Sequence, residues 1–201
     1  ILLKNKENDK AIPVLSRLEN EADASQNKTY AQSNLMKLYY NKKDYPNSGI
    51  YAEKVLMNPK ADDNVKSDAQ IIIARAAIET GDEAKAKVAY AKVLAIAKGE
   101  LAAEALYYDA YFKNKEGKFE ASNAAVQKIA KNYSSYKYFG AKGLILMAKN
   151  FYGLKDSYQA TYILENVIQN FTDYPDVVSE AKTELNAIKT EEAKTNSSIT
   201  K

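Results

Sequence analysis

The chain alternates between segments with apolar residues at helical spacing and short polar breaks. The stretch AKGLILMAKNFYGLKDSYQATYILENVIQNF (141–171) shows the pattern, with one break near its middle. Leu144 and Met147 precede the break at a spacing of three residues, and Leu164 and Val167 follow it at the same spacing. Apolar residues spaced in this way form one face of an α-helix. The stretch therefore predicts two consecutive amphipathic helices joined by a turn.

Similar breaks recur along the chain at a nearly constant distance. Taking one reference residue in each break, the separations are 35, 38, 36 and 38 residues. The reference residues are Asp9, Asp44, Asp82, Lys118 and Asp156. Eight residues before the last four reference residues lie Met36, Ala74, Ala110 and Ala148. Four residues after them lie Ser48, Ala86, Ser122 and Ala160. Eleven residues after them lie Val55, Val93, Ile129 and Val167. Mostly small residues at two positions and an apolar residue at the third suit helix pairs that pack closely and stack.

These repeats predict an all-α fold, an α-solenoid of helix-turn-helix units with a C-terminal capping helix. We expect a single domain at 1–189 and a flexible tail at 190–201. Within the domain, the expected parts are a truncated first repeat at about 1–27, helix pairs at 28–60, 63–98, 100–133 and 137–172, and a capping helix at 175–189. The apolar stripe of the capping helix is predicted to be Val178, Ala181, Leu185 and Ile188, with Glu180, Lys182, Glu184 and Lys189 on its other face.

The repeat at 100–133 fits the pattern least well. Asp109 and Lys113 fall where the other repeats carry mainly apolar or aromatic residues. A shift of the first helix by two residues would place Tyr111 and Phe112 better, and a longer turn at KNKEGK (113–118) would account for it. The sequence alone does not decide this register.

Composition limits the chemistry that the chain can perform. Among the 201 residues there is no histidine and no cysteine, which excludes a Ser-His-Asp triad, disulfides and thiolate metal sites. The paired carboxylates Asp62 with Asp63, and Glu79 with Asp82, lie beside turns and are interpreted as helix caps and loop residues. We therefore expect no enzyme, with no catalytic, cofactor-binding or metal-binding residues. The apolar runs are also too short to span a bilayer.

The repeat pattern resembles the tetratricopeptide repeat. The segments that carry the resemblance best are YYNKKDY (39–45), IETGDEAKAKVAY (78–90) and FYGLKDSYQATYIL (151–164). A narrower resemblance joins residues 132–171 to the C-terminal part of long tetratricopeptide-repeat proteins of the Gram-negative cell envelope, with Phe139 and Gly140 departing from that pattern. It implies a right-handed superhelix in a larger envelope protein, located in the periplasm or at the outer membrane. The cytoplasm is the alternative location.

In that family, the first helices of successive repeats line a concave groove. The resemblance therefore implies that the chain is a non-catalytic scaffold for protein–protein interaction, with a peptide or protein segment bound in this groove. Lysine and arginine beside tyrosine side chains would suit a partner that carries acidic groups. The candidate groove residues are Asn34, Lys37, Tyr40, Arg75, Tyr108, Tyr111, Lys149 and Tyr152.

Two other functions stay open at this point. The segment 111–155 carries nine lysines against Glu116 and Glu120, whereas the whole chain has a net charge of +3. This basic segment could make the chain an adaptor for nucleic acid or an anionic membrane. The truncated first repeat could instead support end-to-end stacking into a structural homo-oligomer. We expect membrane association only through a parent protein or a partner.

Overall fold

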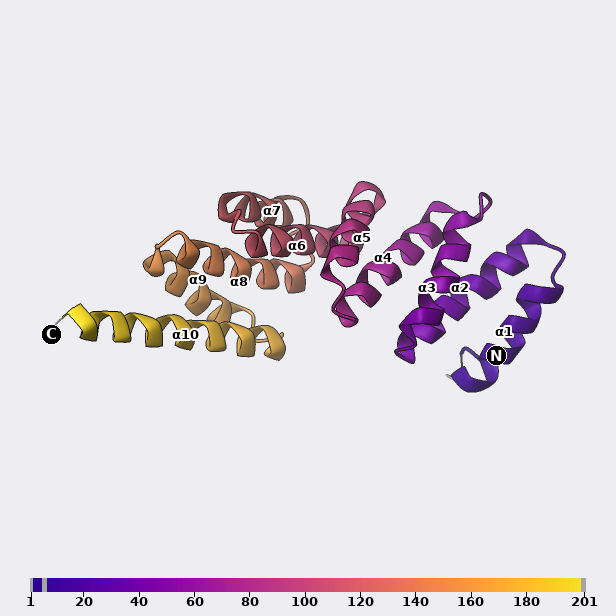
Figure 1. Ribbon diagram of the computed structural model, residues 1–201, viewed down its shortest axis with the longest axis horizontal. Coiled ribbons are helices and arrows are strands. Elements are labelled where there is room, and N and C mark those ends of the chain that lie inside the picture. Colours follow the sequence, from indigo (N-terminus) through magenta and orange to yellow (C-terminus); the bar gives the residue numbers. More distant parts are fainter. Residues whose placement is uncertain (1, 5–6, 200–201) are drawn as a thin grey trace. The chain divides into compact units, whose positions relative to one another are not determined.

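The computed structural model describes residues 2–4 and 7–199, with side chains up to residue 194. Within those ranges the chain forms ten α-helices and no β-strand (Figure 1). The prediction of an all-α fold is therefore confirmed. The helices are α1 (Asn8–Glu21), α2 (Ser25–Asn41), α3 (Tyr45–Met57), α4 (Asp63–Glu79), α5 (Glu83–Ile96), α6 (Gly99–Lys115), α7 (Phe119–Asn132), α8 (Lys137–Gly153), α9 (Ser157–Asn170) and α10 (Pro175–Ile199).

The helices belong to two compact units. The first unit, Ile1–Ala97, holds α1 to α5, and the second unit, Lys98–Lys201, holds α6 to α10. Within each unit every helix packs against the next one, as in an α-solenoid. Even-numbered helices also pack side by side: α2 with α4 in the first unit, and α6 with α8 and α8 with α10 in the second. The even-numbered helices α2, α4, α6 and α8 are each 17 residues long.

The turn inside each helix pair has the same backbone geometry in all four pairs. Just before each reference residue, one residue has a positive φ of 60° to 74°, and these residues are Lys43, Gly81, Gly117 and Lys155. The amide of each reference residue then donates to the carbonyl five residues earlier, at 2.9 Å. This is the Schellman arrangement that ends an α-helix. Asp44, Asp82 and Asp156 also accept an amide hydrogen bond from the first turn of the following helix, and so cap it.

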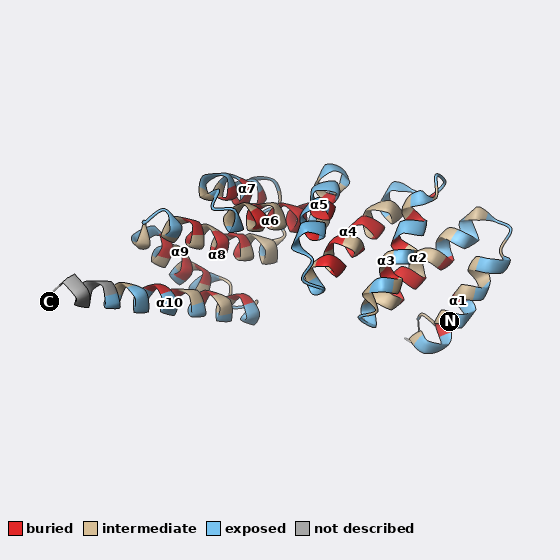
Figure 2. Cartoon of the chain, viewed as in Figure 1, coloured by how far each residue is buried: buried red, intermediate tan, exposed pale blue. Residues whose placement is uncertain are grey.

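The three flanking positions identified in the sequence form the core between paired helices. Every side chain at these positions, from Met36 to Val167, has an exposed fraction of 0%. Two of the four small residues after the turn are serines, and each donates its hydroxyl to the carbonyl of the buried residue twelve positions earlier. Figure 2 shows buried segments, in red, on helices of both units. The repeat register predicted from the sequence is confirmed.

The helix pair α6 and α7 follows the same register as the others. The amide of Lys118 bonds to the carbonyl of Lys113 at 2.9 Å, as in the other turns, and Ala110 is fully buried. The longer turn and the two-residue shift considered from the sequence are therefore wrong. Asp109 fits at its position because its carboxylate pairs with the ammonium of Lys113 one turn later, at 2.7 Å.

Helix α10 packs through one face only. Its buried stripe begins at Val177 rather than at the predicted Val178, and continues through Ala181, Leu185 and Ile188. The helix extends through residues 190–199, where the sequence was expected to form a flexible tail, and residues 200–201 lie outside the described ranges. Glutamate, alanine and lysine in residues 191–194 favour helix without needing a packing partner.

Candidate protein-interaction surface

The predicted partner-binding residues of the first unit lie on α2 and α4. Asn34, Lys37 and Tyr40 are spaced by three residues, which places them on one face of α2. Arg75 lies half-buried on α4, which packs beside α2. The amide of Asn34 donates to a carbonyl of its own helix at 2.7 Å. The ring of Tyr40 packs edge-on against Tyr45, with 5.8 Å between the ring centroids. We call these four predicted residues the unit 1 face.

The predicted residues of the second unit lie on α6 and α8, which also pack side by side. Tyr108 and Tyr111 are in ring contact on α6, with centroids 6.0 Å apart at 73°. Lys149 and Tyr152 lie three residues apart on α8. All four side chains are half-buried, so each rests on the helices and keeps part of its surface in solvent. We call these four residues the unit 2 face.

The lysines of the two faces already contact carboxylates of the next even-numbered helix. Lys37 Nζ lies 2.5 Å from Asp68 Oδ2 on α4, and Lys149 Nζ lies 2.7 Å from Glu184 Oε1 on α10. Lys142 pairs in the same way with Glu180 of α10. Helical periodicity did not predict these pairs and placed Glu180 and Glu184 on the outer face of α10. A usable signal was present, because the paired residues are 31 to 38 positions apart, close to one repeat.

A continuous row of aromatic rings runs from α6 to the start of α10. Successive contacts have centroid separations of 5.0 to 6.2 Å, and the rings in order are Tyr111, Tyr108, Tyr107, Phe139, Tyr138 and Tyr174. Only the first two of these residues belong to the surface predicted from the sequence. The ammonium of Lys142 lies 5.7 Å from the ring centre of Tyr107, within the range of a cation–π contact.

Two tyrosines of this row have raised pKa values. Burial is the main cause for Tyr107, whose pKa lies well above its usual value. Burial, followed by the hydrogen bond from its hydroxyl to Asp176 Oδ2 at 3.0 Å, raises the pKa of Tyr138 to about 12. Both hydroxyls therefore remain protonated near neutral pH and can act as hydrogen-bond donors.

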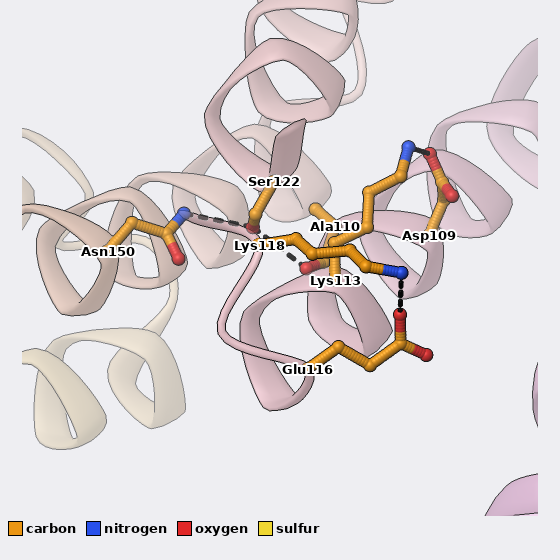
Figure 3. Close-up of polar contacts among 7 residues, drawn as sticks. All are labelled: Asp109, Ala110, Lys113, Glu116, Lys118, Ser122 and Asn150. Carbon is orange, nitrogen blue, oxygen red and sulfur yellow. Dashed lines mark hydrogen bonds and ion pairs between the residues drawn. The ribbon is translucent and has the colours of Figure 1, made fainter. Parts of the chain in front are cut away.

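A buried polar network fixes the helices beneath the unit 2 face (Figure 3). Asn150 on α8 is fully buried, and its amide donates to Ser122 Oγ at 2.9 Å and to Asn123 Oδ1 at 2.7 Å. Its carbonyl oxygen accepts from Asn114 Nδ2 on α6 at 2.8 Å. Ser122 in turn donates to the carbonyl of Ala110 at 2.8 Å. The network links α6, α7 and α8, and so fixes the relative positions of the two helices that carry the unit 2 face.

The excess positive charge of segment 111–155 is partly neutralised within the fold. Lys113 pairs with Asp109 and Lys118 with Glu116, at 2.7 and 2.8 Å (Figure 3). Lys142 pairs with Glu180 of α10, and Lys149 pairs with Glu184 of the same helix. Of the nine lysines, those at 128, 131, 137 and 155 make no ion pair with any residue that the structure describes. This pairing weakens the case for nucleic acid or membrane binding through this segment.

Three of the four carboxylates noted in the sequence accept hydrogen bonds within the fold. Asp62 and Asp82 cap α4 and α5 by accepting amide hydrogen bonds at 2.9 and 3.0 Å, and Glu79 accepts a hydrogen bond from the hydroxyl of Tyr45. Among the side chains that the structure describes, no group of three or more acidic residues is arranged to hold a metal ion. None of the described helices combines the length and the apolar character needed to cross a membrane.

Comparisons with models of known protein families and with curated proteins give no match for this chain.

Proposed function

We propose that the chain is a non-catalytic interaction scaffold of the tetratricopeptide type, which binds an acidic peptide or protein segment along its even-numbered helices. The observation that carries the proposal is the composition of the unit 2 face, where two neighbouring helices carry half-buried tyrosines and a lysine in a partly exposed ion pair. The repeated helix pairs also support the proposal, because stacked repeats form extended binding surfaces.

The tyrosines would supply most of the contact energy. Tyr108 and Tyr111 hold each other in a T-shaped contact and rest on Phe112, so their orientation is largely set before a partner arrives. Rigid aromatic side chains with a polar tip lose little conformational entropy on binding and are enriched among the residues that dominate interface energies. A partner that contacts α6 would therefore gain apolar contact area at a low entropic cost.

The lysines would select the charge of the partner. The pair between Lys37 and Asp68 leaves 49% and 39% of the two side chains exposed, and such surface pairs contribute only ~0–1 kcal/mol. The pair between Lys149 and Glu184 is also partly exposed, at 33% and 29%. A carboxylate of the partner can therefore replace the internal acid, or share the lysine with it, at little cost in stability. An acidic partner is favoured over a basic one for this reason.

The proposal extends to the setting of the chain. We infer a right-handed superhelix within a larger protein of the Gram-negative cell envelope, in the periplasm or at the outer membrane. The support for this setting is the resemblance of residues 132–171 to envelope proteins of this type.

The proposal can be tested by selecting binders from a library of random peptides on the intact chain. We expect the selected peptides to be enriched in aspartate and glutamate. Their affinity should fall at least tenfold for Lys149→Glu and for Tyr111→Ala, while Lys131→Glu, an exposed charge reversal on α7, should change it little. Glu184→Gln should increase the affinity, because it removes the internal competitor for Lys149. Equal loss for Lys131→Glu and Lys149→Glu would show only a general charge effect and would contradict the proposal.

A further inference from the structure

The second unit contains a cavity of about 370 Å³. It is formed by the C-terminal half of α7, the turn that follows, the N-terminal half of α8 and the end of α9. Its described lining residues are Val126, Ile129, Ala130, Tyr133, Ser134, Lys137, Gly140, Leu144, Asn170 and Phe171. Among these residues, none belongs to the unit 2 face. A cavity of this size is within the usual range for sites that bind small molecules.

Two glycines of α8 shape this region in different ways: Gly143 allows close packing on α7, and Gly140 leaves open space in the cavity. A Cβ atom at Gly143 would lie 3.1 Å from Val126, so α8 can approach α7 closely at this point. One helical turn earlier, a Cβ atom at Gly140 would find no described atom within 4 Å. The wall of the cavity is otherwise apolar, with Ile129, Leu144 and Phe171 among its side chains. Burial of an apolar group in this space would contribute a favourable free energy of ~25 cal/mol per Å² of apolar surface removed from water.

The polar side chains of the cavity belong to Lys137, Ser134, Tyr133 and Asn170, and the amide of Asn170 already donates to the carbonyl of Asn166. Lys137, Ser134 and Tyr133 supply an ammonium group and two hydroxyls, and these groups make no hydrogen bond or ion pair with any residue in the described ranges. Among the described lining residues none carries a carboxylate, so the charge of Lys137 is not compensated there. Lys137 and Ser134 are exposed, which leaves them accessible from solvent. This contrasts with Lys142 and Lys149 on the same helix, which both pair with glutamates.

We infer that this cavity binds a small aliphatic carboxylate, with the chain in the apolar space and the carboxylate at Lys137. A carboxylate would accept a charge-assisted hydrogen bond from the ammonium group and could accept others from the two hydroxyls. The apolar chain would fill the volume left open beside Gly140. A cationic or acid-free amphiphile would gain the apolar contacts alone.

The test uses isothermal titration of the intact chain with dodecanoate, and with dodecanol as the uncharged probe, below the concentrations at which either aggregates. We expect saturable binding of one dodecanoate per chain, at least tenfold tighter than dodecanol. Lys137→Gln should weaken dodecanoate about tenfold and leave dodecanol unchanged, while Lys131→Gln should affect neither probe. Lys149→Glu on the proposed interaction surface should also leave dodecanoate binding unchanged.

A second variant tests the cavity itself. Gly140→Leu places a side chain into the open space without a backbone clash and should reduce binding of both probes at least tenfold. Gly49→Leu on α3 is the matched control, because a Cβ there also meets no described atom within 4 Å, and it should bind dodecanoate normally. Circular dichroism establishes that each variant is folded. Any one of three results would overturn the inference. The first is that dodecanoate shows no saturable binding, and the second is that Gly140→Leu binds the probes as the parent chain does. The third is that Lys137→Gln and the parent chain bind dodecanoate with equal affinity.

Discussion

The buried network around Asn150 allows a quantitative test of how the second unit is held together. Ser122 and Ser48 occupy equivalent positions, are both fully buried, and donate to backbone carbonyls at 2.8 and 3.0 Å. Ser122 also accepts a hydrogen bond from Asn150 on the next helix, whereas the equivalent residue of the helix that follows Ser48 is Ala76, which has no polar side chain. The two serines therefore differ mainly in this additional partner, which makes Ser48→Ala a matched control for Ser122→Ala.

The expected magnitudes follow from these contacts. Ser48→Ala removes one hydrogen bond from a carbonyl within a helix, and we expect a loss of about 1 kcal/mol or less in the free energy of unfolding. Ser122→Ala removes the equivalent bond and also leaves one N–H of the fully buried Asn150 without its acceptor. An unsatisfied buried donor costs ~1–3 kcal/mol, so Ser122→Ala should be more destabilising than Ser48→Ala by at least ~1 kcal/mol.

A double-mutant cycle then isolates the interaction between the two side chains. Asn150→Ala removes three hydrogen bonds and should cost about 2–4 kcal/mol. The double variant Ser122→Ala/Asn150→Ala removes both partners of the hydrogen bond, so its loss should be at least ~1 kcal/mol smaller than the sum of the single losses. Urea unfolding followed by circular dichroism measures all four proteins. Equal losses for the two serine variants, together with additive losses in the cycle, would refute the reasoning.

Three further predictions concern caps, turns and pH. Asp82→Ala should lower the free energy of unfolding in urea by ~1 kcal/mol, whereas Asp82→Asn, which keeps a capping oxygen, should cost less than half of that. Lys155→Gly should raise the melting temperature, because a positive φ of 69° is strained for lysine and costs ~1–2 kcal/mol there; an unchanged or lower value would contradict this. The pKa of Tyr138 is raised to about 12 from an ordinary 10.0, so its stabilising effect is present below pH 10 and is lost as the pH rises towards 12. Alkaline unfolding of Tyr138→Phe should therefore depend less steeply on pH in that window than unfolding of the parent chain.

The sequence was sufficient to predict the helix pairs and their core register. Small or apolar residues recur at fixed distances from each turn, and those positions proved to be fully buried. The turn geometry was harder to predict from residue types, because two of the four left-handed positions carry lysine instead of glycine. In the fourth repeat, the charged Asp109 and Lys113 suggested a shifted register, but their mutual ion pair allows both to remain on a half-buried surface.

Most contacts between repeats were not predicted from the sequence, although the charged pairs recur at about one repeat length. The partner of Lys149 is Glu184 on α10, a residue that helical periodicity alone assigned to the outer face of that helix. The aromatic row across α6 and α8 depends on how the two helices pack, and only part of it was predicted. The cavity at Gly140 depends on a local departure from close packing, which a pattern of residue types does not reveal.

The central claim is that partners bind along the even-numbered helices. The most direct test is nuclear magnetic resonance of the isotope-labelled chain, with an acidic peptide from the selection described above added stepwise. We predict that the amide shift changes will concentrate on the even-numbered helices, including α6 and α8 around Tyr111 and Lys149, and will be small on α7 and α9. Shift changes that concentrate on α7 and α9 would contradict the account and would place the interaction surface on the odd-numbered helices.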